Sequence, residues 1–162
     1  MAMPMPIFLM NFGNWFLRSS LFILYHSSVR LTASSSQIAE NSVIFPKVCG
    51  AFSHELRAWI ACYISKKANH IKLSNKFLKN ANKNATWTNP NCNTKIDLKI
   101  LISFVDKVSN NTKDVEAKDI TILKKAGLAD EDIVRLCQLI AFVSFQIRVI
   151  TGLELINREK NE

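Results

Sequence analysis

The sequence predicts an all-α fold, and three observations support this class. Only four glycines and four prolines occur in 162 residues, fewer than a β fold with many tight turns requires. Apolar residues recur at steps of three and four in several segments, which is the period of a helix, and no long segment shows the two-residue alternation of a strand. With 48% hydrophobic residues, the chain is long enough for one domain with its own core.

The segment Asp130–Leu155 is predicted to be the central helix. Asp130 is expected to cap it, and Glu131 and Asp132 suit the positive end of the helix dipole. Further apolar residues fill much of the remaining surface, so we expect this helix to be buried on most faces. The residues that recur with the helical period are Ile133, Leu136, Cys137, Ile140, Val143, Ile147, Ile150 and Leu153.

Residues 1–35 are predicted to form an apolar N-terminal arm. Three interpretations stay open for residues 1–25: a targeting segment, a helix packed on the domain or on a neighbouring subunit, or a start codon assigned too early. A signal peptide would begin with a basic region, which is missing here. A membrane span would need about 20 predominantly apolar residues, and Asn11, Gly13 and Asn14 interrupt this run.

Residues 36–156 are predicted to form the domain, and residues 157–162 a charged C-terminal tail. The first helix of the domain is expected to kink or end early at Pro46, because proline lacks the N–H that a helix interior needs. Later in the domain, an amphipathic helix is expected over Asp97–Val108. A short helix over Glu116–Gly127 is expected to close with its glycine as the C-terminal cap.

Between these helices, Ser53 is expected to cap a helix that runs from about His54 into Phe77. The middle of this helix is polar, so a break or a second helix from about Asn69 is an open alternative. Residues 79–95 are rich in asparagine and show no period, which predicts a loop.

The formal net charge of +8 raises the question of a nucleic-acid or anionic-membrane partner. Lysines crowd residues 66–83 and 95–99, but aromatic residues do not alternate with them as a platform for single-stranded nucleic acid would need. We therefore expect a solvated lysine face and no nucleic-acid partner.

The four cysteines lie far apart, without the spacing of a zinc site or a CxxC pair. This pattern favours reduced thiols in a cytoplasm. The sequence also lacks a glycine-rich loop and a cluster of carboxylates and histidines, so we expect no cofactor and no metal.

Several short motifs follow one another in a characteristic order and spacing. They are Ala126-Gly127-Leu128, Asp130-Glu131-Asp132-Ile133, Phe142, Phe145, Arg148 and Gly152-Leu153, with Leu56-Arg57, Ile60-Ala61 and Ile64-Ser65 upstream. In this order they resemble the alkylhydroperoxidase AhpD-like / carboxymuconolactone decarboxylase superfamily, in particular its peroxidase-related members. The resemblance covers roughly residues 36–156 and depends on the order and spacing of these degenerate motifs together. It implies an all-α, AhpD-like helical bundle that assembles as a dimer, trimer or hexamer.

In the peroxidase members that the chain resembles, a CxxC pair reduces the peroxide, and a glutamate and a histidine relay the proton. One thiolate attacks the O–O bond and the second thiol resolves the sulfenic acid as a disulfide. The resemblance places Ala58 at the glutamate position, His70 and Leu73 at the two cysteine positions, and Phe77 at the histidine position. All four residues differ from the family pattern.

A shifted alignment that uses Glu55 as the glutamate places Lys67, His70 and Ser74 at the other three positions, again without a thiol. No two cysteines lie within three residues of each other anywhere in the chain, so gaps cannot restore the pair. Dithiol peroxidase chemistry of the family type is therefore not expected, and whether the chain is an enzyme of another kind stays open.

Three hypotheses follow. The favoured one is a degenerate member that keeps the helical homo-oligomer and has lost the alkylhydroperoxide reductase activity. The second is a lyase or decarboxylase-like enzyme on the same fold, which needs no cysteine pair. The third is a peroxidase with a rewired thiol site. The candidates are His70, His54, Glu55 and Arg148 for the second hypothesis, and Cys62 or Cys137 for the third. A structural pairing of Arg148 with Asp97 or Glu55 is the expected alternative to a catalytic Arg148.

Overall fold

The computed structural model describes residues 37–159, and within this range it contains helices and no strand. The predicted all-α class is therefore confirmed for the described part of the chain. The chain divides into two compact units, Met1–Ala39 and Glu40–Glu162, and the following account concerns the second. The predicted N-terminal arm lies outside the described residues, as does the end of the charged tail, residues 160–162.

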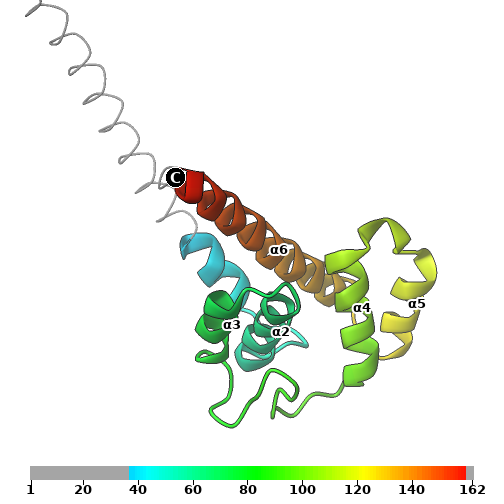
Figure 1. Cartoon of the computed structure of the whole chain (residues 1–162). Coiled ribbons are helices and arrows are strands. Elements are labelled where there is room, and N and C mark those ends of the chain that lie inside the picture. The colour runs from blue at the N-terminus through cyan, green and yellow to red at the C-terminus, as the bar shows by residue number, and fades with distance from the viewer. Residues whose placement is uncertain (1–36, 160–162) are drawn as a thin grey trace, which may run out of the picture. The chain divides into compact units, whose positions relative to one another are not determined.

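The second unit is built from α2 (His54–Lys67), α3 (Ile71–Leu78), α4 (Leu98–Asn110), α5 (Ala117–Lys125) and α6 (Asp130–Glu159) (Figure 1). A short 3₁₀ helix, η1 (Thr112–Asp114), joins α4 to α5. A helix over residues 37–44 ends before Pro46, as predicted. Residues 79–97 form the predicted loop between α3 and α4, with one isolated bridge between Thr86 and Asn89.

The most buried element is α2, in which every residue from Leu56 to Ser65 is buried. The hydroxyl of Ser53 accepts a hydrogen bond from the Leu56 N–H at 3.2 Å, so this residue is the predicted N-terminal cap. The helix ends at a turn in which Asn69 has a φ of 60°. This left-handed residue breaks the helical path, and α3 follows as a separate helix packed on α2. The break near Asn69 is therefore confirmed.

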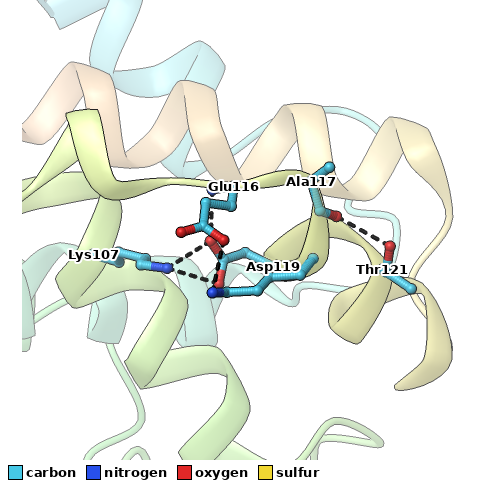
Figure 2. A network of polar contacts seen from close by, with 6 residues as sticks. Lys107, Glu116, Ala117, Asp119 and Thr121 are labelled. Carbon is cyan, nitrogen blue, oxygen red and sulfur yellow. Dashed lines mark hydrogen bonds and ion pairs between the residues drawn. The ribbon is translucent and has the colours of Figure 1, made fainter.

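Helices α4 and α5 are joined by a polar network around Asp119 (Figure 2). The Lys107 ammonium contacts this carboxylate at 2.7 Å, and the Glu116 N–H donates to it at 2.8 Å. These bonds, led by the one from Lys107, lower the pKa of Asp119. At the start of α4, the Asp97 carboxylate accepts from the Lys99 N–H at 2.8 Å, which fixes that end. The two predicted helices of this region are thus present with caps at their N-terminal ends.

The prediction that the last helix is buried on most faces is wrong. Helix α6 runs past α2 and α4 (Figure 1), and it contacts these two helices and α5. No residue of α6 beyond Val143 is buried. Its buried residues are Ile133, Leu136, Leu139, Ile140 and Val143.

The start of α6 also differs from the prediction. Asp130 is the first residue of the helix rather than the residue before it. Its carboxylate contacts the Lys124 ammonium at 2.6 Å. By length and composition, α6 alone among the described helices would be able to cross a membrane, but a core helix passes the same test.

Candidate functional site

Three of the four positions that would hold the peroxidase residues lie in the hydrophobic core. Ala58 on α2 and Phe77 on α3 are 0% exposed, and Leu73 is 6% exposed. Each belongs to the same apolar cluster, so these positions supply no polar group. Ala58 and Phe77 are closed off from solvent, whereas Leu73 also lines the groove described below.

The fourth position, His70, lies apart from this cluster at the N-terminal end of α3 and is partly exposed. Its Nε2 atom is 2.9 Å from the hydroxyl oxygen of Thr151 on α6. The same hydroxyl oxygen is 2.9 Å from the Ile147 carbonyl oxygen. Which group donates in the bond between His70 and Thr151 depends on the tautomer of the ring.

His70 lines an open groove of about 720 Å³ between the α2–α3 turn and the second half of α6. Its apolar lining includes Leu73, Ile147 and Ile150, and cationic and anionic side chains lie among the others. One of the lysines, Lys76, already contacts the buried Glu40 carboxylate at 2.6 Å. The full lining is Ala68, Asn69, His70, Ile71, Lys72, Leu73, Lys76, Ile147, Ile150, Thr151 and Glu154.

The two thiols considered as nucleophiles are both in environments that disfavour the thiolate. Cys62 is fully buried in α2, and its sulfur lies 3.3 Å from the hydroxyl oxygen of Ser74. Burial raises the pKa of the Cys62 thiol, with a smaller opposing effect from that hydrogen bond. Burial also raises the pKa of Cys137, which is partly buried on α6. All four cysteines of the chain are free, so the structure contains no Cys62–Cys137 disulfide.

The remaining candidates lie in different places. Glu55 is in the first turn of α2, where hydrogen bonds from the backbone and from Ser53 lower its pKa. The ring of His54 donates from Nε2 to the Pro46 carbonyl at 3.0 Å, which is a structural contact. Arg148 is exposed on α6. Of the lyase candidates, His70 alone lines the groove.

The predicted pairing of Arg148 with an acid is wrong within the described residues, and the buried arginine is Arg57 instead. Arg57 is 2% exposed and donates to three backbone carbonyls. The donors are Nε to Phe52 at 3.1 Å, Nη1 to Val43 at 3.2 Å and Nη2 to Cys49 at 2.9 Å. An arginine within an otherwise apolar stretch of α2 was a signal for this role.

Among residues 37–159, no group of three histidine, cysteine, aspartate or glutamate side chains is arranged to hold a metal ion. Compared with models of protein families, with curated proteins and with solved structures, the chain finds no significant match in any of the three.

Proposed function

We propose that the chain is a helical assembly module of AhpD-like ancestry that no longer reduces alkyl hydroperoxides. The observation that supports this most directly is the burial of Ala58, Leu73 and Phe77 in one apolar core. A dithiol peroxidase needs two thiols within disulfide reach and a proton relay beside them. Alanine, leucine and phenylalanine supply neither, and the Ala58 and Phe77 side chains are fully buried.

The thiols that remain support the same proposal. The nucleophile in peroxide reduction is the thiolate, which an electropositive and partly open environment stabilises. Cys62 and Cys137 have the opposite environment, because burial raises the pKa of both. A free, protonated thiol in a helical core is the behaviour of a structural cysteine. It also suits a protein of the reducing cytoplasm.

A second candidate function, a lyase that needs no cysteine, is supported by the groove at His70. The imidazole of His70 lines this groove, and its Nε2 atom is hydrogen-bonded to the Thr151 hydroxyl. A histidine of this kind can act as a general base toward a small substrate in the groove. We rank this function second because Glu55 and Arg148 do not line the same groove.

The test combines two assays on the full chain. Reduced parent protein is offered an alkyl hydroperoxide with a dithiol reductant, beside Cys62→Ser and Cys137→Ser variants. We expect no repeated turnover by any of them and four titratable thiols in the denatured parent. Turnover by the parent that either substitution abolishes would establish a rewired thiol site. A screen of small carboxylic acids, compared with His70→Ala, tests the lyase candidate. Substrate loss that depends on His70 would replace the assembly proposal.

A further inference from the structure

The stretch from residue 56 to residue 96, which covers most of α2, all of α3 and nearly all of the loop after α3, contains no acidic residue. Two of its seven lysines pair with acids from other segments. Lys67 lies 3.7 Å from the Asp106 carboxylate. Lys76 lies 2.6 Å from the Glu40 carboxylate. The other five form no ion pair with a residue in the range 37–159, so their charge is available to an anionic partner. They are Lys66, Lys72, Lys79, Lys83 and Lys95.

A groove beside the C-terminal half of α3 brings two of these lysines together. Its volume is about 570 Å³, and Lys79 and Lys83 line it together with the amide side chains of Asn75 and Asn82. The rest of its lining is leucine and alanine, and no carboxylate of the described chain belongs to it. An ammonium group binds a phosphate as a point charge, and an amide both donates and accepts hydrogen bonds. The groove therefore suits a phosphate group on a molecule that carries further polar groups.

The loop after α3 presents a tryptophan to solvent beside this basic stretch. Trp87 is 44% exposed, at the tip of a turn in which Thr86 and Asn89 exchange two backbone hydrogen bonds, at 2.8 and 3.1 Å. The turn is attached to α2, because the indole of the buried Trp59 donates to the Thr86 carbonyl at 2.7 Å. The Lys66 ammonium lies 5.9 Å from the centre of the Trp87 ring. A hydrogen-bonded backbone thus holds a large aromatic ring next to a cation.

The groove and the tryptophan adjoin each other. Ala85 lines the groove, and Trp87 follows two residues later, which is at most about 7 Å along the chain. Aromatic residues do not alternate with lysines in the sequence, and for that reason no nucleic-acid partner was expected. Lys66 and Trp87 are far apart in the sequence, so folding creates an aromatic–cation pair that the sequence pattern does not contain.

We infer that this basic surface binds single-stranded nucleic acid, with backbone phosphates at Lys79 and Lys83 and a base stacked on Trp87. A basic groove that follows the backbone, combined with an aromatic ring on which a base stacks, is how proteins bind single strands without sequence preference. In a duplex the bases remain stacked on one another, so none is available to the Trp87 ring. The inference goes beyond the proposed function and does not depend on it.

An anionic membrane is the main alternative, because lysine and tryptophan also occur at lipid surfaces. A segment that binds a lipid surface usually buries several large apolar side chains at the headgroup boundary. Within residues 79–97, Trp87 is the one exposed large hydrophobic side chain, and its neighbours are mainly asparagine and threonine. Such side chains hydrogen-bond to bases and sugars, whereas burying them in a bilayer is costly. The loop therefore favours a nucleic acid over a membrane.

The first experiment measures binding of a labelled oligothymidylate to the full chain by fluorescence anisotropy at several salt concentrations. Replacing both groove lysines, by Lys79→Gln together with Lys83→Gln, should reduce the slope of log K against log salt by about 1.4. The reason is that each phosphate contact on a single strand contributes about 0.7 to that slope. The matched control, Lys113→Gln together with Lys125→Gln, removes the same charge from exposed lysines of η1 and α5. It should retain the slope of the parent.

The second experiment tests the stacked base. Trp87→Ala should weaken binding at least fivefold, which is the lower end of what one base–aromatic stack contributes. Trp87→Phe retains a ring and should bind more tightly than Trp87→Ala. Circular dichroism confirms that all variants remain folded.

A parent that does not bind the oligonucleotide at low salt would overturn the inference. So would a Trp87→Ala variant that binds like the parent, or a control that loses as much of the salt slope as the groove variant. A parent that binds no oligonucleotide but floats with phosphatidylcholine–phosphatidylglycerol vesicles through Trp87 would replace the nucleic acid by a membrane. None of these outcomes bears on the proposed loss of peroxidase activity, which the peroxide assay tests separately.

Discussion

Removal of the Arg57 guanidinium is expected to destabilise the fold more than most single substitutions do. The guanidinium donates to the carbonyls of Val43, Cys49 and Phe52, and so attaches the whole 43–52 segment to α2. Arg57→Ala leaves these three acceptors without their donor and leaves a cavity in the core. An unsatisfied buried polar group costs about 1–3 kcal/mol.

The three costs do not add in full. Val43 and Cys49 are only partly buried, so water can reach their carbonyls after the substitution. Burial also lowers the pKa of Arg57, which means that the folded state already bears a cost for the charge. The net loss expected for Arg57→Ala is therefore about 3–4 kcal/mol, a large share of the 5–15 kcal/mol that typically separates folded from unfolded chains.

Urea unfolding, monitored by circular dichroism, measures this loss as a change in the free energy of unfolding. Arg57→Lys retains a charge but lacks the fork of donors, so we expect it to lose nearly as much stability. Arg148→Ala is the control at an exposed arginine and should change stability by less than about 0.5 kcal/mol. A loss below about 1 kcal/mol for Arg57→Ala would refute the view that this side chain holds the segment in place.

Three further predictions concern stability. Gly50→Ala should lower the free energy of unfolding by about 2–3 kcal/mol, because Gly50 has a φ of 62° and the new Cβ would displace the Asp132 carboxylate from its bonds to the Ala51 N–H and to Arg135. Gly127→Ala, at a φ of 93° in open space, should lower it by only about 1–2 kcal/mol on urea unfolding. Because the pKa of Cys62 is raised in the folded state, its thiol ionises at lower pH in the unfolded chain. The free energy of unfolding should therefore fall as pH rises above about 8.5. In the Cys62→Ser variant it should fall less between about pH 7 and 9.5. The lowered pKa of Asp119 means that its contribution is present above about pH 4 and is lost as pH falls through the folded value. Asp119→Asn, which cannot form the ion pair with Lys107, should therefore lose less stability than the parent between about pH 4 and 2. An unchanged pH profile in either variant would contradict its assignment.

Most of the helices and several of their ends could be predicted from the sequence, because the signals for them are local. Ser53 and Asp97 each accept a backbone N–H of the helix that they precede. Pro46 lies just past the end of the helix over residues 37–44, and Gly127 follows α5 with a positive φ. Each of these effects depends on one residue and its immediate neighbours, so no tertiary information is needed.

The relative burial of α2 and α6 could not be predicted in this way. Hydrophobic content favoured α6 as the central helix, although α2 is the buried one. The polar Arg57 and Ser65 lie within the buried stretch of α2, and both donate to backbone carbonyls there. A satisfied polar group is tolerated inside a protein, and the acceptors that satisfy Arg57 come from a separate segment.

The candidate site, like the fold, could be predicted from the sequence only in part. Apolar residues at positions 58, 73 and 77 predicted the absence of a proton relay, and their burial agrees with a filled core. The environment of His70 depends instead on Thr151, which is 81 residues away and lies on α6. A contact at that separation follows from helix packing, so the sequence identified the histidine but not its hydrogen bond or its groove.

The core between α2 and α3 and the exposed side of α6 differ in what a single substitution can change. A carboxylate or an imidazole at the fully buried Ala58 or Phe77 would have no partner there, and an unpaired buried polar group costs several kcal/mol. Restoring the relay would therefore require the core between α2 and α3 to be repacked. The exposed side of α6 is not restricted in this way, because side chains such as Phe145 and Val149 contact solvent and can change without loss of the fold.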